Sequence, residues 1–165
     1  GKTTLVNALK ETKQFKDYNF ATERSQHLMS LGIPLNTDST LKGQTVFLAE
    51  RCGELMYDNI ITDRTILDVM AFTLNAKSIP HQDKNAFEVY ASEFIREYDY
   101  IFYISPHGIE IEDNGIRETD EHYRDLIDFT ITTLIKRHGH KAGKIEKISG
   151  STEERIQQIL NITSL

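Results

Sequence analysis

The sequence predicts an α/β fold in which a mostly parallel sheet carries helices on both faces. Short β-branched or aromatic runs, such as Ile60-Ile61 and Tyr100-Ile101-Phe102-Tyr103, alternate with longer segments whose apolar residues repeat at helical spacing. Charged residues directly follow some of these runs, as expected where parallel strands end at a ligand site. The alternation favours a parallel sheet, because the connection between two parallel strands is usually a helix.

Composition limits the classes of protein to which the chain can belong. Its 165 residues suit one domain, which we expect to span residues 1–165. The net charge of −6 is not the basic footprint of a duplex-binding protein, so nucleic acid is an open but not a favoured partner. Cys52 is the single cysteine, which excludes an internal disulfide framework and makes the cytoplasm the expected location. No apolar run is long enough to span a membrane, so no membrane partner is expected.

The first half of the chain predicts three helical segments around a short strand, then a second strand and a further helix. Gly32 and Pro34 mark a loop, and Thr40 is a suitable helix cap. The expected elements are a helix from Thr3 to about Lys13, a strand at 18–22, a helix to about Leu31, a loop at 32–37, a helix from about Gln44 to Tyr57, a strand at 60–61 and a helix at 66–74.

The second half continues the same alternation. Ser105-Pro106 closes a strand, and Thr119-Asp120-Glu121 is a helix start. The expected elements are a helix at 85–98, a strand at 99–104, a polar loop at 107–119, a helix to about Arg137, an edge-like strand at 144–150 and a last helix that begins near Ser151 and is held by Ile156, Ile159 and Leu160.

Gly1-Lys2-Thr3-Thr4 matches the second half of the phosphate-binding pattern G-x-x-x-x-G-K-[ST] and leads directly into an apolar helical face. The first glycine and the strand before it are not in the sequence, which we interpret as loss of the first residues. Backbone N–H groups at a helix N-terminus attract phosphate. We therefore expect Gly1 to Thr4 to bind the phosphates of ATP, with Lys2 at the β- and γ-phosphates and the Thr3 hydroxyl on Mg²⁺.

Two charged pairs follow predicted strands and are candidates for the reaction partner's site. In Glu23-Arg24 and Asp63-Arg64, either carboxylate is a candidate to orient or deprotonate the hydroxyl of an acceptor, or to hold a metal-bound water. The arginines Arg24 and Arg64 are suited to bidentate binding of an acceptor phosphate. The alternative interpretation of each pair is a solvated ion pair without a functional role.

The polar loop at about 107–119 is a candidate lid. Arg117 within it and Arg124 in the next helix are expected to bring guanidinium charge to the γ-phosphate, although solubility alone also explains arginines in such a loop. The six histidines show no metal-binding spacing. Most aromatic residues on helices are expected in the core, and Phe47, Tyr57 and Tyr90 are the candidates if a base is stacked.

Taken in order, several motifs resemble the NadR-type P-loop kinases, which include the AAA-type ATP-binding domain of ribosylnicotinamide kinase and small bacterial and phage-encoded relatives. The motifs cover most of the chain and are Gly1-Lys2-Thr3-Thr4, Thr22-Glu23-Arg24, Gly32-Ile33-Pro34-Leu35-Asn36, Ile61-Thr62-Asp63-Arg64-Thr65, Tyr98-Asp99-Tyr100-Ile101-Phe102-Tyr103 and Asp113-Asn114-Gly115-Ile116-Arg117-Glu118-Thr119-Asp120-Glu121. The Asp63-Arg64 pair is also similar to the Asp-Arg motif of thymidylate kinases, whose arginine contacts the acceptor nucleotide.

The resemblance implies a P-loop NTPase fold, a three-layer α/β/α sandwich with a mostly parallel sheet of about five strands, and a kinase that uses ATP and Mg²⁺. The first strand of that sheet is missing from this sequence, so we expect the sheet to lack its central strand. It also adds weight to Arg117 as a lid arginine. No adenylyltransferase or DNA-binding segment accompanies the motifs, so we do not expect the bifunctional regulator. The acceptor stays open between a nucleoside, a (deoxy)nucleoside monophosphate and hydroxymethylpyrimidine in DNA. A non-kinase module that binds and hydrolyses ATP is the alternative class, and the oligomeric state is open, a dimer included.

Overall fold

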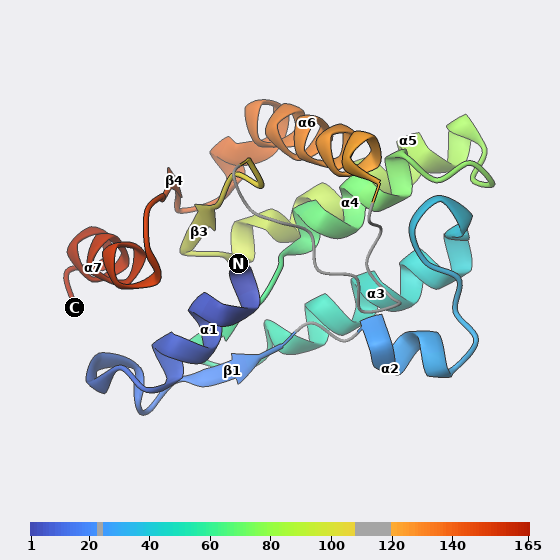
Figure 1. Ribbon diagram of the computed structural model, residues 1–165. Coiled ribbons are helices and arrows are strands. Elements are labelled where there is room, and N and C mark those ends of the chain that lie inside the picture. The colour runs from blue at the N-terminus through green and yellow to red at the C-terminus, as the bar shows by residue number, and fades with distance from the viewer. Residues whose placement is uncertain (23–24, 108–119) are drawn as a thin grey trace.

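The computed structural model describes residues 1–22, 25–107 and 120–165, in which helices surround two pairs of short strands (Figure 1). The helices are α1 (Lys2–Lys10), α2 (Ser25–Ser30), α3 (Leu41–Glu54), α4 (Ile66–Leu74), α5 (His81–Ser92), α6 (Glu121–His138) and α7 (Thr152–Thr163). The strands are β1 (Asn19–Ala21), β2 (Ile60–Thr62), β3 (Tyr100–Tyr103) and β4 (Lys144–Lys147). Their order along the chain confirms the predicted alternation.

The four described strands form two separate parallel pairs. β1 pairs with β2, with Phe20 opposite Ile61, and β3 pairs with β4, with Ile101 opposite Ile145. A single sheet of about five strands was expected, and the described residues do not form it. Residues of β2 and β3 line one cavity of about 900 Å³ and do not hydrogen bond to each other, so the two pairs stay separate.

The two faces of the strands carry different helices. Ile101 packs into the larger core, which α3, α4, α5 and α6 build, whereas Phe102 and Ile104 pack against a smaller core built by α1 and α7. This alternation follows from the two-residue period of a strand. Figure 1 shows the same division, with α4, α5 and α6 grouped together and α7 near β4. Helices on both faces of parallel strands are the arrangement that the sequence predicts.

Three helix boundaries differ from the predicted ones, and a side-chain cap explains the first of them. The Thr40 hydroxyl accepts a hydrogen bond from the Gly43 N–H at 3.0 Å, so α3 begins at Leu41, earlier than expected. Pro80 is the N-cap of α5, which starts at His81 and passes into a 3₁₀ segment at Glu93–Glu97. α1 ends at Lys10, and another 3₁₀ turn follows at Lys13–Phe15.

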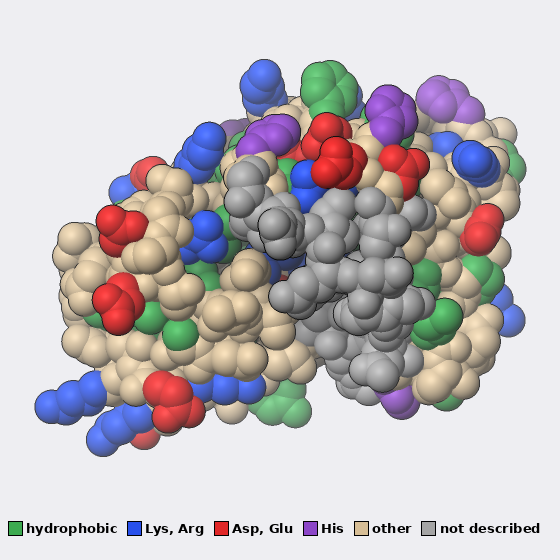
Figure 2. Space-filling model, in the orientation of Figure 1, with side chains coloured by type: hydrophobic (Ala, Val, Ile, Leu, Met, Phe, Trp, Pro, Cys, Tyr) green, Lys and Arg blue, Asp and Glu red, His purple; other side chains and the backbone are tan. Residues whose placement is uncertain are grey.

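The visible surface mixes both signs of charge. Figure 2 shows acidic and basic side chains interspersed over the described part of this face, without a basic stripe along it. This distribution gives no support to tight binding of duplex nucleic acid on that face. Among the described helices, none has both the length and the apolar composition needed to cross a bilayer.

Candidate nucleotide-binding site

The cavity between the two strand pairs brings together most of the site residues predicted from the sequence. Its walls come from the start of α1, the ends of β2 and β3, and faces of α3, α4 and α6. The predicted site residues that line it are Gly1, Lys2, Thr3, Asp63, Arg64 and Arg124. Thr4 is exposed, and its hydroxyl oxygen lies 3.4 Å from the backbone nitrogen of Gly1. The clustering occurs at the ends of parallel strands, where α/β folds bind ligands.

Thr3 and Asp63 are in direct contact although sixty residues separate them in the sequence. The Thr3 hydroxyl donates to Asp63 Oδ2 at 2.6 Å, and the Asp63 side chain is only 2% exposed. Position and orientation of Asp63 follow from β2, because its backbone N–H continues the strand pairing by donating to the Ala21 carbonyl at 2.8 Å. The carboxylate that follows β2 is thereby fixed against the first turn of α1.

This pair of oxygens suits a magnesium ion. Mg²⁺ prefers oxygen ligands and is usually held by one or two carboxylates together with substrate phosphates, not by a cage of protein groups. Thr3 supplies a hydroxyl and Asp63 a carboxylate, next to the α1 N-terminus that attracts phosphate. Within the described residues, no group of three or more His, Cys, Asp or Glu side chains is arranged to hold a metal by itself. The donor set therefore fits an ion that arrives with phosphate.

Arg64 has a backbone conformation that is unusual for a residue with a side chain. Its φ is +83°, in the left-handed region that favours glycine. The Thr62 hydroxyl donates to the Arg64 carbonyl at 2.8 Å and so stabilises this turn. Such conformations cost about 1–3 kcal/mol and are concentrated at functional sites. The strained turn aims the Arg64 side chain into the cavity instead of along the strand.

Two groups on α4 hold the Arg64 guanidinium. Nη1 lies 4.0 Å from Asp68 Oδ1, and the guanidinium carbon lies 5.5 Å from the centre of the Phe72 ring. Asp68 also accepts a hydrogen bond from the Thr65 N–H at 2.8 Å, which caps the start of α4. These two contacts restrain one side of the Arg64 guanidinium, which has five N–H donors. Its other donors can bind an anionic or polar ligand.

Arg51 is a site residue that the sequence reasoning missed. It is 4% exposed, its Nη1 donates to the Asp63 carbonyl at 3.1 Å, and its Nη2 lies 2.9 Å from Glu54. The backbone of Asp63 is therefore held from α3 as well as from β1. The available signal was spacing, because Arg51 repeats at helical intervals with the apolar Phe47 and Leu55 and so had to face inward.

Tyr103 and Asp128 join the end of β3 to α6 on another wall of the cavity. The tyrosine hydroxyl donates to Asp128 Oδ1 at 2.5 Å. Burial and the adjacent Asp128 carboxylate raise the pKa of Tyr103 to about 12. The hydroxyl therefore stays protonated at neutral pH and keeps donating to the carboxylate.

The remaining predicted residues divide into those that the structure places and those that it does not describe. Glu23, Arg24, Arg117 and nearly all of the proposed lid at 107–119 lie outside the described residues. Of the aromatic candidates, Phe47 and Tyr57 line the cavity. Tyr90 lies on α5 and is 63% exposed, with its ring against Phe94.

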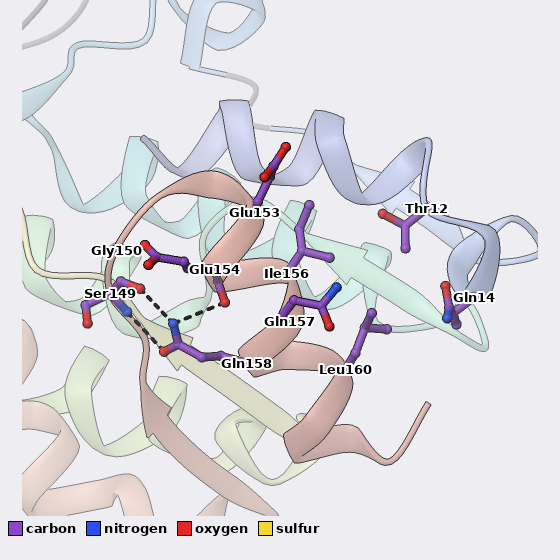
Figure 3. A pocket seen from close by; sticks show the side chains of 10 residues that line it. All are labelled: Thr12, Gln14, Ser149, Gly150, Glu153, Glu154, Ile156, Gln157, Gln158 and Leu160. Carbon is purple, nitrogen blue, oxygen red and sulfur yellow. Dashed lines mark hydrogen bonds between the residues drawn. The ribbon is translucent and has the colours of Figure 1, made fainter.

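A second hollow, of about 930 Å³, lies between the end of α1 and the first turns of α7 (Figure 3). None of the predicted phosphate or acceptor residues lines it. Figure 3 shows the Gln158 side chain turned toward the backbone of Ser149, to which it both donates and accepts hydrogen bonds. These bonds fix the turn between β4 and α7. The expected phosphate and acceptor residues therefore point to the first cavity as the candidate site.

Comparison with known proteins identifies the family of the chain. No curated protein and no solved structure matches the chain. The family model described as AAA domain matches residues 1–155, which is nearly the whole sequence, and it includes both the α1 start and the residues that follow β2. The chain therefore belongs to the AAA domain family, a family of P-loop proteins that bind nucleotides.

Proposed function

We propose that the protein is a kinase that transfers the γ-phosphate of ATP to a nucleoside or a (deoxy)nucleoside monophosphate. The observation that carries the proposal is the 2.6 Å hydrogen bond between Thr3 and Asp63, in a cavity that Arg64 also lines. A site for ATP alone needs the α1 start and a metal ligand. A second polar group beyond the metal ligand, on a strained turn, indicates a place for a second substrate.

In the proposed site the residues divide between ATP, the metal ion and the acceptor. Gly1 to Thr4 bind the phosphates of ATP, and Lys2 contacts the β- and γ-phosphates. Thr3 and Asp63 hold Mg²⁺, which when bound offsets the charge on the phosphate oxygens. Asp63 also accepts a hydrogen bond from the acceptor hydroxyl or from a water on the metal, a role that Glu23 shares as a candidate. Arg64 binds the acceptor, while Arg24, Arg117 and Arg124 are additional candidates around the phosphates.

The test is ATP consumption measured against a panel of acceptors. The panel holds nucleosides, deoxynucleoside monophosphates, nicotinamide riboside, and plain and hydroxymethylated DNA. We expect one class of small acceptor to stimulate consumption strongly. Lys2→Ala and Asp63→Asn should each lower the stimulated rate by about a hundredfold or more, because both groups act where charge develops during transfer. Arg64→Ala should mainly raise the KM for the acceptor.

The control variant is Arg96→Ala, which removes an exposed arginine paired with Glu93 and should leave the rate unchanged. A slow rate that no member of the panel stimulates would contradict the kinase proposal and favour a nucleotide-dependent regulatory module. Stimulation by hydroxymethylated DNA alone would move the acceptor from a small molecule to a nucleic acid.

A further inference from the structure

One face of α3 forms a wall of the cavity that Arg64 also lines. Gln44, Phe47, Arg51 and Leu55 recur at intervals of three or four residues, and all four line the cavity. Phe47 is partly exposed there, and Arg51 is bonded to the Asp63 carbonyl. This face therefore runs from the metal-binding pair deep into the protein, and Gln44 lies at its far end.

Gln44 is a buried residue whose amide makes one long side-chain hydrogen bond. Its residue is 3% exposed, and its single side-chain contact within the described part of the chain is with the Thr73 hydroxyl at 3.5 Å. That hydroxyl already donates to the Val69 carbonyl at 2.8 Å, so it offers Gln44 little. Gln44 also lines the cavity, so its amide has hydrogen-bonding capacity left for a ligand there.

The surroundings of Gln44 suit a flat ring. Phe47 on α3 and Phe72 on α4 both line the cavity, and Phe72 is in contact with the guanidinium of Arg64. Leu35 and Asn36 complete the wall, and their loop is anchored to the segment before α5. There the Lys77 N–H donates to the Thr37 carbonyl at 3.1 Å, and the Ser78 hydroxyl donates to the Ser39 carbonyl at 2.7 Å. The wall is therefore fixed before a ligand binds.

We propose that Gln44 recognises the planar ring of the acceptor by hydrogen bonding to the ring's polar edge, between Phe47 and Phe72. The class of ligand is a neutral heterocycle that presents a donor and an acceptor side by side, as nucleobases do. A carboxamide has the same two groups side by side and pairs with such an edge. The inference rests on the proposed function for the identity of the second substrate, and it assigns Gln44 the choice of ring.

The experiment measures binding and turnover separately. Binding of thymidine, deoxycytidine, deoxyadenosine and deoxyguanosine to the protein is measured by titration calorimetry, and turnover is measured with the same nucleosides and their monophosphates. Gln44→Leu should weaken binding of the preferred nucleoside about tenfold or more. 2-Deoxyribose and its 5-phosphate carry no nucleobase, so Gln44→Leu and the unmodified protein should bind them equally.

Gln44→Glu supplies a readout that a structural role would not change. It preserves the shape of the side chain but replaces the amino donor by an oxygen acceptor. The ratio of affinities should therefore shift toward deoxyguanosine, whose N1–H and N2 amino group present two donors side by side, and away from thymidine and deoxycytidine, whose edges pair one donor with one acceptor. Gln158→Leu is the matched control, because that amide is bonded to Ser149 on α7's side of the protein, and it should change neither affinity nor preference.

Two results would overturn the inference. One is an unchanged ratio of deoxyguanosine to thymidine in Gln44→Glu together with unchanged affinities in Gln44→Leu. The other is failure of every nucleoside to bind the unmodified protein. Nucleosides that bind and depend on Gln44 but never accept phosphate would refute the kinase proposal and still support the ring site, so the two failures are distinguishable.

Discussion

Arg64 combines a strained backbone with a side chain that faces the cavity. Its left-handed φ of +83° disfavours any residue with a Cβ, and the protein retains an arginine there. The site uses the arginine side chain, whereas the backbone conformation favours glycine. The position is therefore one where function costs stability.

We predict that Arg64→Gly is more stable than Arg64→Ala by about 1 kcal/mol, because glycine adopts positive φ without strain. Both variants lose the guanidinium, so the difference between their free energies of unfolding reports the backbone strain. Urea unfolding of the two variants measures it. Equal free energies of unfolding would show that the turn is not strained. Both variants should have the same defect in acceptor use, since neither retains the side chain.

The N-terminal cap of a helix fixes where the helix begins, and α4 is the helix whose start matters most to the site. The Thr65 hydroxyl accepts from the Leu67 N–H at 3.1 Å, and Asp68 accepts from the Thr65 N–H, which together form a capping box directly after Arg64. The Tyr98 hydroxyl also accepts from the Ile66 N–H at 3.2 Å, which fastens the same turn to the core. α7 has an equivalent capping box, in which Ser151 and Glu154 play these parts, away from the site.

Thr65→Ala and Ser151→Ala should each lower the free energy of unfolding by about 1 kcal/mol, because each removes a side-chain cap. Only Thr65→Ala should also raise the KM for the acceptor, since it loosens the turn that presents Arg64. Parallel measurements of unfolding and of acceptor kinetics test this difference. A raised KM in both variants would attribute the effect to lost stability in general.

A pH-dependent contact joins α5 to α6. Burial opposes ionisation of Glu88, but hydrogen bonds from His138 and Arg137 outweigh it and hold the pKa of the Glu88 carboxyl below its ordinary value. A carboxyl whose pKa is lowered on folding stabilises the protein above the unfolded-state pKa of about 4.3, and that stability is lost as the pH falls through the lower, folded value.

Glu88→Gln should therefore be less stable than the unmodified protein by about 1 kcal/mol near pH 6, with the difference disappearing below about pH 4. Urea unfolding of both proteins between pH 3 and pH 7 measures the difference. Glu146→Gln, which removes a more exposed pair with Lys144, is the control. A difference that persists unchanged at pH 3 would show that the charge of Glu88 is not the source of the stabilisation.

The sequence allowed the order of elements to be predicted, because strand and helix periods are local properties. The residues that hold the site together were harder to foresee. Arg51 and Gln44 are polar residues on a helix face that sequence patterning assigns to the core. The Asp63 carbonyl explains Arg51, and the cavity that Gln44 lines explains Gln44. Strand pairing was predicted as one sheet because alternation specifies parallel neighbours but not which strands hydrogen bond to each other.

In the whole molecule, the cavity separates two cores that a ligand would connect. α1 belongs to the smaller core with α7, α4 belongs to the larger one, and between them Thr3 and Asp63 make a direct side-chain contact. A nucleotide bound at the start of α1 and a metal ion held by Asp63 would tie both cores to one ligand. Ligand binding and global stability should therefore be strongly linked in this protein.

We expect ATP with Mg²⁺ at a hundred times its Kd to add about 2.7 kcal/mol of stability, which corresponds to a rise in Tm of roughly 5–10 °C for a chain of this size. ATP with EDTA should give a much smaller rise. Asp63→Asn should remove most of the difference made by Mg²⁺, because it removes the charged metal ligand, while the control Arg96→Ala preserves it. Thermal unfolding under the two conditions measures both effects. Equal shifts with and without Mg²⁺ would mean that the phosphates bind without the metal, and Thr3 and Asp63 would then be a structural contact only.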